Sequence, residues 1–521
     1  MYIAPNSVVN ILSNVPLKND YKHTILFASR SAQNSYFSSK ISYTFNNLSY
    51  AKPYEKKVRL EKSADDLYGA NYVMFQNSSF GQKWWFAFIT NVEYINNTTS
   101  EITYEIDVMQ SFMFDTTINP CFVERQHAEF DDIGLNIVPE PVEVGEYVYS
   151  NRQDITALDD MAVILAILNQ DPMTIGVEIG SYDHIFSGFD LWAFRSSDIE
   201  GIRLTLTVHQ SSPDDIKGFY MVPSFLVGNI PIGGKKLIPS GSTSFVTSKL
   251  NYTVIKPQGN EPFEQYTDVK NKKLYTYPYN FLMVSNNSGN SLNLRYEKFT
   301  SGGGFEVEGS ILPPVKTIIR PTGYKGSSSA SAQENLTLES YPECSWTGDS
   351  YSQWKAQNSV PIALNAASGA AQSALVGAFT GFNPVTMAAS AIGSVSKLLS
   401  ESYSASIAAD QCRGNTNSAN INAMHSKQHF VIQRANIQRN YAESIDSFFT
   451  VFGYAQKRIM TPNRNARPQF TYIKTNGSNV TGNCPAEMLA RINRAYDDGI
   501  TFWNHPENMY NYNVDNSPYS D

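Results

Sequence analysis

One long stretch without a single charged side chain constrains this chain more than any other feature. It runs from Ala356 to Ser396 and is built mainly from Ala, Gly, Ser, Val and Phe. The stretch is longer than the roughly 20 apolar residues that one membrane helix needs. Asn383 and Pro384 interrupt it, which favours a helical hairpin over one straight helix.

Small residues recur at every fourth position of this stretch from Gly369 to Gly381, a spacing that lets apolar helices approach closely. Three interpretations are open: a buried core hairpin, a transmembrane anchor, or a segment that is sheltered in one state and enters lipid in another. Asn365 and Gln372 interrupt the stretch and no Lys/Arg cluster flanks it, which argues against a simple anchor.

The composition of the whole chain favours β structure. Aromatic residues make up 13% of its 521 residues, and Tyr and Phe fit half-buried strand faces. The formal net charge of −8 argues against a protein that coats DNA with a basic face. A hydrophobic content of 42% excludes a disordered chain.

Hydrophobic patterns predict the secondary structure in outline. Runs of aromatic and β-branched residues between turn signals predict strands over most of residues 1–345, with a loop at Gly302–Gly304 and a short helix start at Ser63. The clearest predicted strands are residues 73–77, 84–90, 102–108, 161–168, 204–208, 273–279 and 292–296. Helical spacing predicts one amphipathic helix over about 433–452, followed by short strands at 470–475 and 500–503.

The expected fold class is therefore mainly β with a minor α part. We expect four regions along the chain: an N-terminal β domain over 1–120, a middle β region over 121–345, the uncharged stretch with its polar flank over 346–425, and a C-terminal helix with strands over 426–521.

Motifs for catalysis are missing. The sequence contains no phosphate-binding P-loop, no zinc-protease motif, no serine-hydrolase elbow and no dinucleotide fingerprint. His425 and His429 are spaced to share a helix face, but a metal site needs a third ligand and none is apparent nearby. We therefore expect no catalytic residue, no cofactor and no metal.

Adjacent carboxylates occur in pairs, which is typical of turns and helix caps. Two glycosidase acids can nevertheless come from distant strands, so a glycan hydrolase stays an alternative. The pairs are Asp65–Asp66, Asp131–Asp132, Asp159–Asp160 and Asp497–Asp498.

The cysteines and the first residues suggest assembly in a reducing cytosol. The four cysteines are far apart in sequence, so a disulfide framework is not expected. The first residues, Met1–Ser7, lack the basic and apolar regions of a secretory signal.

Three blocks of sequence resemble the distal tail tube, or tail knob, proteins of small short-tailed bacteriophages of Gram-positive hosts, the picovirus-like podoviruses. The first block is Ile11–Thr24. The second is discontinuous and the third lies near the C-terminus. The second comprises Asp66–Asn77, Gly81–Phe88 and Tyr104–Phe114, and the third comprises Ser444–Tyr454 and Asp498–Asn504. The uncharged stretch lies between the blocks as it does in the family, whereas about 125–340 departs from the pattern.

The resemblance implies a structural virion protein of the phage tail, assembled in the host cytoplasm. Six copies would form a hollow tube with β-barrel-like wall domains from both chain ends. The tube would join a collar or proximal tail protein to tail-tip proteins and conduct double-stranded DNA without sequence specificity. Apolar loops would plug its lumen and, on release, penetrate the host cell membrane. The loop residues expected to act on the membrane are Val360, Ile362, Leu364, Gly369, Leu375, Val376, Gly377, Phe379, Gly381, Phe382, Pro384, Val385, Met387, Ile392, Val395, Leu398 and Leu399.

Two other functions stay open at this point. One is a virion-associated hydrolase of cell wall or glycan. The other is a receptor-binding tail protein in which the uncharged stretch forms a trimerisation core.

Overall fold

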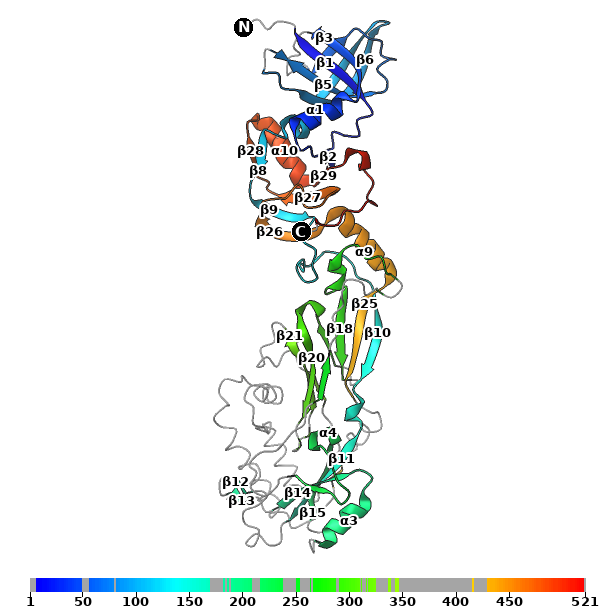
Figure 1. Cartoon of the computed structure of the whole chain (residues 1–521), viewed down its shortest axis with the longest axis vertical. Helices are drawn as coiled ribbons and strands as arrows, with labels where there is room; N and C mark the ends of the chain where they lie inside the picture. The colour runs from blue at the N-terminus through cyan, green and yellow to red at the C-terminus, as the bar shows by residue number, and fades with distance from the viewer. Residues whose placement is uncertain are drawn as a thin grey trace. The chain divides into compact units, whose positions relative to one another are not determined.

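A computed structural model describes most of the chain outside the uncharged stretch. The described residues are 6–48, 56–78, 81–168, 181–182, 185–186, 189–208, 216–237, 250–253, 263, 266–286, 290–309, 311, 315, 317–324, 336–338, 343–345, 415–416 and 429–519. Strands predominate among them, which confirms the expected fold class (Figure 1).

The chain forms two compact units, and each is discontinuous in sequence. Unit 1 comprises Met1–Gly145, Pro262–Leu274 and Arg439–Asp521. Unit 2 comprises Glu146–Glu261 and Tyr275–Gln438.

Unit 1 holds two main sheets, a small two-stranded sheet and four α-helices among its described residues. Its strands are β1 (Ser7–Ser13), β2 (His23–Ile25), β3 (Ile41–Leu48), β4 (Lys57–Leu60), β5 (Ala70–Asn77), β6 (Trp85–Asn96), β7 (Thr99–Ile106), β8 (Thr116–Ile118), β9 (Cys121–Gln126), β26 (Tyr454–Met460), β27 (Phe470–Asn476), β28 (Val480–Gly482) and β29 (Ile500–Trp503). Its helices are α1 (Arg30–Ser38), α2 (Val108–Phe112), α9 (Arg439–Phe452), α10 (Ala486–Asp498) and the short 3-10 helix η8 (Pro506–Asn508).

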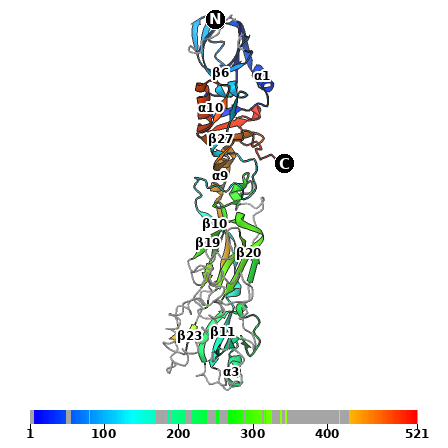
Figure 2. The ribbon, with the colours of Figure 1, turned by 90° about the vertical axis from the view of Figure 1, so that its left-hand side faces the viewer.

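The N-terminal sheet carries a hydrophobic cluster on each face. Its strand order is β3-β1-β5-β6-β7-β4. Tyr72 of β5 stacks on Phe37 of α1 on one face, and α1 runs beside this sheet in Figure 2. On the other face, Phe45 of edge strand β3 and Leu60 of edge strand β4 pack into one cluster. Because both edges contribute to that cluster, the sheet curls into a half-barrel.

The C-terminal sheet joins strands from distant parts of the chain in the order β2-β29-β27-β9-β26. Helix α10 covers one face (Figures 1 and 2). There Ile492 packs in one cluster with Val123 and Ile473. Helix α9 ends before Gly453, whose φ of +64° gives the left-handed turn that ends many helices.

Unit 2 is built from three larger sheets and one small hairpin. Its strands are β10 (Tyr147–Asp154), β11 (Met161–Leu168), β12 (Ser181–Tyr182), β13 (Ile185–Phe186), β14 (Phe189–Arg195), β15 (Ile216–Pro223), β16 (Lys235–Lys236), β17 (Leu250–Thr253), β18 (Asn280–Ser285), β19 (Ser291–Leu294), β20 (Phe299–Gly309), β21 (Thr317–Tyr324), β22 (Leu336–Leu338), β23 (Glu343–Ser345), β24 (Asn415–Thr416) and β25 (Val431–Ile437). Its helices are α3 (Ile199–Val208), α4 (Ser224–Val227) and the 3-10 helices η2 (Thr156–Leu158) and η5 (Tyr296–Lys298). A further 3-10 helix, η4 (Lys272–Tyr275), crosses from unit 1 into unit 2.

One hydrophobic core joins the three larger sheets of unit 2. Ile164 of β11, Val284 of β18 and Val307 of β20 belong to the same cluster. The neighbouring β11 residues Val163 and Leu165 pack into a second cluster on the opposite face. Strand β11 is thus buried on both sides, as its continuous apolar run predicts.

Several local predictions are wrong, and nearby contacts give the reasons. Residues 204–208 end helix α3 rather than forming a strand, because the Asp198 side chain accepts the amide N–H of Gly201 at 2.9 Å and starts a helix. The glycines at 302–304 lie inside strand β20, at an irregularity in its pairing with β21, rather than in a loop. Ser63 caps Asp66 as expected, but a turn rather than a helix follows.

The predicted start of the amphipathic helix is also wrong. Helix α9 begins at Arg439, because residues 431–437 form strand β25 between β10 and β18. Helix α10 is absent from the sequence prediction. Residues 273–279 were expected to be a strand but begin in η4, where polar contacts described below hold the chain.

Candidate functional site

The predicted membrane-active residues lie outside the described residues, from Val360 to Leu399. Among the described residues, no helix is long and apolar enough to span a membrane. The structure does describe the two strands between which the uncharged stretch is inserted.

These two strands are neighbours in one sheet. Strand β23 pairs with β15 on one side and with β24 on the other. Cys344 lies opposite Thr416 and Ser345 lies opposite Asn415, in antiparallel register. The chain therefore leaves the sheet after Ser345 and returns to it at Asn415, directly alongside. We call this pair the root of the uncharged stretch.

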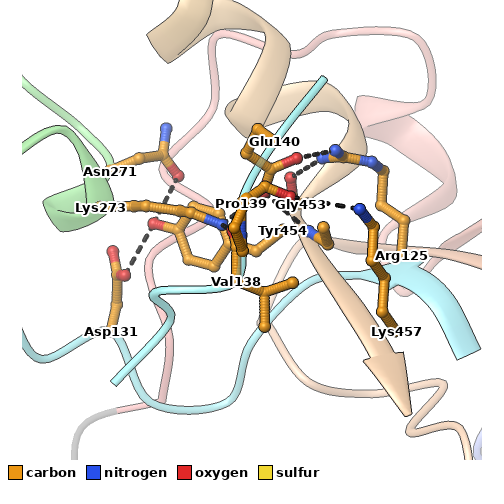
Figure 3. Close-up of polar contacts among 11 residues, drawn as sticks. Arg125, Asp131, Val138, Pro139, Glu140, Asn271, Lys273, Gly453, Tyr454 and Lys457 are labelled. Carbon is orange, nitrogen blue, oxygen red and sulfur yellow. Dashed lines mark hydrogen bonds and ion pairs between the residues drawn. The ribbon is translucent and has the colours of Figure 1, made fainter. Parts of the chain in front are cut away.

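A second notable site is a cluster of buried charges in unit 1 (Figure 3). The Glu140 side chain is fully buried and accepts hydrogen bonds from Arg125 and Lys273. It also accepts the backbone N–H of Ala455 at 2.9 Å. The Lys273 ammonium donates a further bond to the Val138 carbonyl at 2.7 Å. Burial lowers the pKa of Lys273, and the Glu140 carboxylate opposes that shift.

Asp446 of helix α9 is the second buried carboxylate of this region. It accepts the Tyr266 hydroxyl at 2.6 Å and the backbone N–H groups of Lys270 and Asn271 at 2.8 and 3.0 Å. The Asn271 side chain donates to Asp446 at 2.8 Å and to the Thr450 hydroxyl at 2.8 Å. The Asp446 carboxylate thus accepts four hydrogen bonds from residues 266–271, which offset the cost of burying it.

Asp131 is the third buried carboxylate. It accepts the Tyr454 hydroxyl at 2.7 Å and the backbone N–H of Lys272 at 3.0 Å. Burial raises the pKa of Asp131, and the hydrogen bond from Tyr454 opposes that shift. The Arg467 guanidinium lies 6.0 Å from the centre of the Tyr454 ring.

Arg125 and Lys273 thus pair with Glu140, and the positive charge of Arg467 opposes the raised pKa of Asp131. The carboxylates and their partners come from all three sequence stretches of unit 1. No periodic pattern marks these residues, so sequence reasoning missed them apart from Asp131. Their arrangement binds chain segments together, and none of the contacts described requires a ligand.

The other predicted reactive groups have structural partners. His429 precedes strand β25 rather than lying on a helix, and its ring nitrogens contact Asp154 at 2.9 Å and Asp159 at 3.3 Å. Asp497 accepts the Thr475 hydroxyl at 2.7 Å and the backbone N–H of Ser478 at 3.0 Å. Within the described ranges, no group of three or more His, Cys, Asp or Glu side chains is placed to hold a metal. His425 and Cys412 lie outside those ranges.

Two family models match the sequence. The model described as the C-terminal domain of tail knob protein gp9 of Bacillus phage phi29 matches residues 245–517. The model described as the N-terminus of caudoviral major tail proteins matches residues 5–117, which include all six strands of the half-barrel.

Individual phage proteins are similar to the chain over nearly its whole length. Tail knob protein gp9 of Bacillus phage phi29 is 26% identical, with 98% of each chain covered. The corresponding protein of Bacillus phage B103 is 24% identical with the same coverage. The solved structure of the tail knob protein gp12 of bacteriophage C1 superposes with a TM-score of 0.57 at 14% identity, covering 97% of this chain and 98% of that chain.

Proposed function

Because this chain belongs to the family of the phi29 tail knob proteins, we propose that six copies of it form a hollow tube at the distal end of a phage tail. The half-barrel and the C-terminal sheet of unit 1 build the wall. The middle region 121–345 supplies accessory parts, and region 346–425 acts on the membrane. The observation that carries this proposal is the family match over residues 245–517, which contain the uncharged stretch.

The tube conducts the genome during ejection. It joins the collar or proximal tail protein above to tail-tip proteins below. Passing double-stranded DNA is not gripped or read by sequence, and a net charge of −8 is compatible with a lumen that does not hold phosphates.

The uncharged stretches plug the lumen before infection and then leave it to penetrate the host cell membrane. As helices they satisfy their own backbone groups in lipid, and their small residues at four-residue spacing supply helix contacts. The root supports entry as a hairpin, because both ends of the stretch start from neighbouring strands. The stretch would then cross the membrane an even number of times, and about 20 residues for each of two crossings fits its length.

The change is a population shift between sheltered and inserted loops. Moving such an equilibrium from 1:99 to 99:1 requires lipid contact to favour insertion by about 5.5 kcal/mol. No covalent step is involved, and the relatives are named as tail knob proteins. Asp131, Asp159 and Asp497 have structural partners, so no contact given for the described part of the chain favours the hydrolase alternative.

A deletion of Ala356–Ser396 tests this function. We expect the variant to assemble like wild type but to lose dye release from liposomes. A matched control of full length carries Val376→Ser, Phe379→Ser and Phe382→Ser, which removes apolar groups without shortening the loop, and we expect it to release little dye. Dye release by the deletion variant at the wild-type level would contradict the proposed mechanism.

A further inference from the structure

The short middle piece of unit 1 is attached in an unusual way. Between Pro262 and Leu274 the chain returns from unit 2 to unit 1 and then leaves again. Residues 266–271 belong to no sheet: Tyr266 forms only an isolated bridge with Phe263, and the 3-10 helix η4 follows from Lys272. The segment therefore lacks the ladder of backbone bonds that fixes a strand.

Buried carboxylates take the place of that ladder. Asp446 accepts the backbone N–H groups of Lys270 and Asn271, and Asp131 accepts that of Lys272. Glu140 then holds the side chain of the next residue, Lys273. Four consecutive residues are thus bound by three acids that come from the first and third stretches of unit 1.

The attachment of residues 266–274 determines how many chain connections join folded parts of the two units. The chain crosses between the units after Gly145, Glu261, Leu274 and Gln438. When residues 266–274 are bound, four chain connections join the units. When they are released, only the connections after Gly145 and Gln438 still lead to a folded part of unit 1.

We propose that residues 266–274 form a clasp that is held by Asp446, Asp131 and Glu140 and opens separately from the rest of unit 1. When the clasp is open, the connections after Glu261 and Leu274 no longer lead to a folded part of unit 1; the uncharged stretch emerges from unit 2. The link to release of that stretch rests on the proposed function, whereas the clasp itself does not.

Hydrogen exchange of the purified full-length chain tests the clasp. In the variant Asp446→Asn an NH₂ group, which cannot accept, replaces one of the two oxygens that accept the N–H groups of Lys270 and Asn271, so we expect exchange of these amides to rise about tenfold to a hundredfold. The amides of helix α10 should keep their wild-type rates, because separate parts of a protein open with different free energies.

Two further variants sharpen the result. Glu443→Gln makes a similar chemical change on the same helix, at a partly exposed residue that pairs with Arg439, and should leave exchange at residues 270–272 unchanged. Tyr266→Phe removes only one donor to Asp446 and should raise exchange about threefold to tenfold, which provides a test if Asp446→Asn does not fold.

The proposal is overturned if amide exchange at residues 270–272 rises neither in Asp446→Asn nor in Tyr266→Phe. It is also overturned if the α10 amides accelerate by the same factor, because the segment would then open only with the whole unit. The measurement uses no lipid and no assembled tail. A failed leakage experiment would therefore leave the clasp standing, and an absent clasp would leave the leakage result standing.

Discussion

At the residue scale, unit 1 buries several acids, although acidic side chains are mostly exposed in folded proteins. Asp107 caps helix α2 by accepting the N–H of Gln110 at 3.0 Å, and it also accepts the Tyr72 hydroxyl at 2.8 Å. It is 1% exposed, and burial raises its pKa to about 6. The burial of Asp107 could not be predicted from its neighbours in sequence, because it depends on the fold of the half-barrel. The turn positions of Asp65 and Asp66, in contrast, could be predicted from local chemistry, whereas Asp131 is buried and Asp497 lies in helix α10.

The raised pKa of Asp107 predicts a specific pH dependence. Folding favours the protonated acid, so its stabilising contribution is complete below about pH 4 and is lost as the pH rises through about 6. Asp107→Asn imitates the neutral acid. Its free energy of unfolding relative to wild type should therefore increase by up to about 3 kcal/mol between pH 4 and pH 7.

Chemical denaturation at both pH values measures this difference. Asp65→Asn, at an exposed carboxylate, is the control and should give the same difference at both. The comparison must be relative, because burial also lowers the pKa of His127, which destabilises the fold as the pH falls. An Asp107→Asn difference that does not change with pH would contradict the assignment.

At the element scale, strands with a strong pattern could be predicted and irregular contacts could not. The apolar run at Met161–Leu168 matches strand β11 at both ends. The end of the amphipathic helix at Phe452 was also predictable, since Gly453 follows it. Its start was not, because residues 433–437 are recruited by two partner strands from elsewhere in the chain. The clasp likewise depends on acids more than 100 positions away.

The root of the uncharged stretch gives a prediction at this scale. Ser345 and Asn415 are direct antiparallel partners, so an Asn-Gly turn can join them in place of residues 346–414. We expect this variant to unfold at the wild-type temperature or above, because the shorter loop costs less closure entropy. Thermal unfolding followed by circular dichroism measures the effect.

A shifted closure provides the matched control. Joining Glu343 to Thr416 with the same turn also removes Cys344 and Ser345, which pair with both β15 and β24, and Asn415 of β24. This variant should unfold at a lower temperature than the first. Equal unfolding temperatures for the two variants would mean that the β23–β24 pairing contributes nothing to the thermal stability of the protein.

At the scale of the whole molecule, the chain is one tail knob protein assembled from interleaved stretches. The family could be predicted from sequence blocks at both ends, which lie in the half-barrel, in helices α2 and α9 and in the C-terminal sheet. The interleaving of the two units could not, because it depends on contacts between residues that are far apart in sequence.

Cryo-electron microscopy of the purified protein, compared with the Ala356–Ser396 deletion, tests the central claim most directly. We expect sixfold hollow rings or short tubes for both proteins, with density inside the lumen of wild type that is missing in the deletion variant. Threefold particles would contradict the account and point to the receptor-binding alternative. Sixfold particles whose lumen density is unchanged by the deletion would contradict the assignment of the uncharged stretch as the plug.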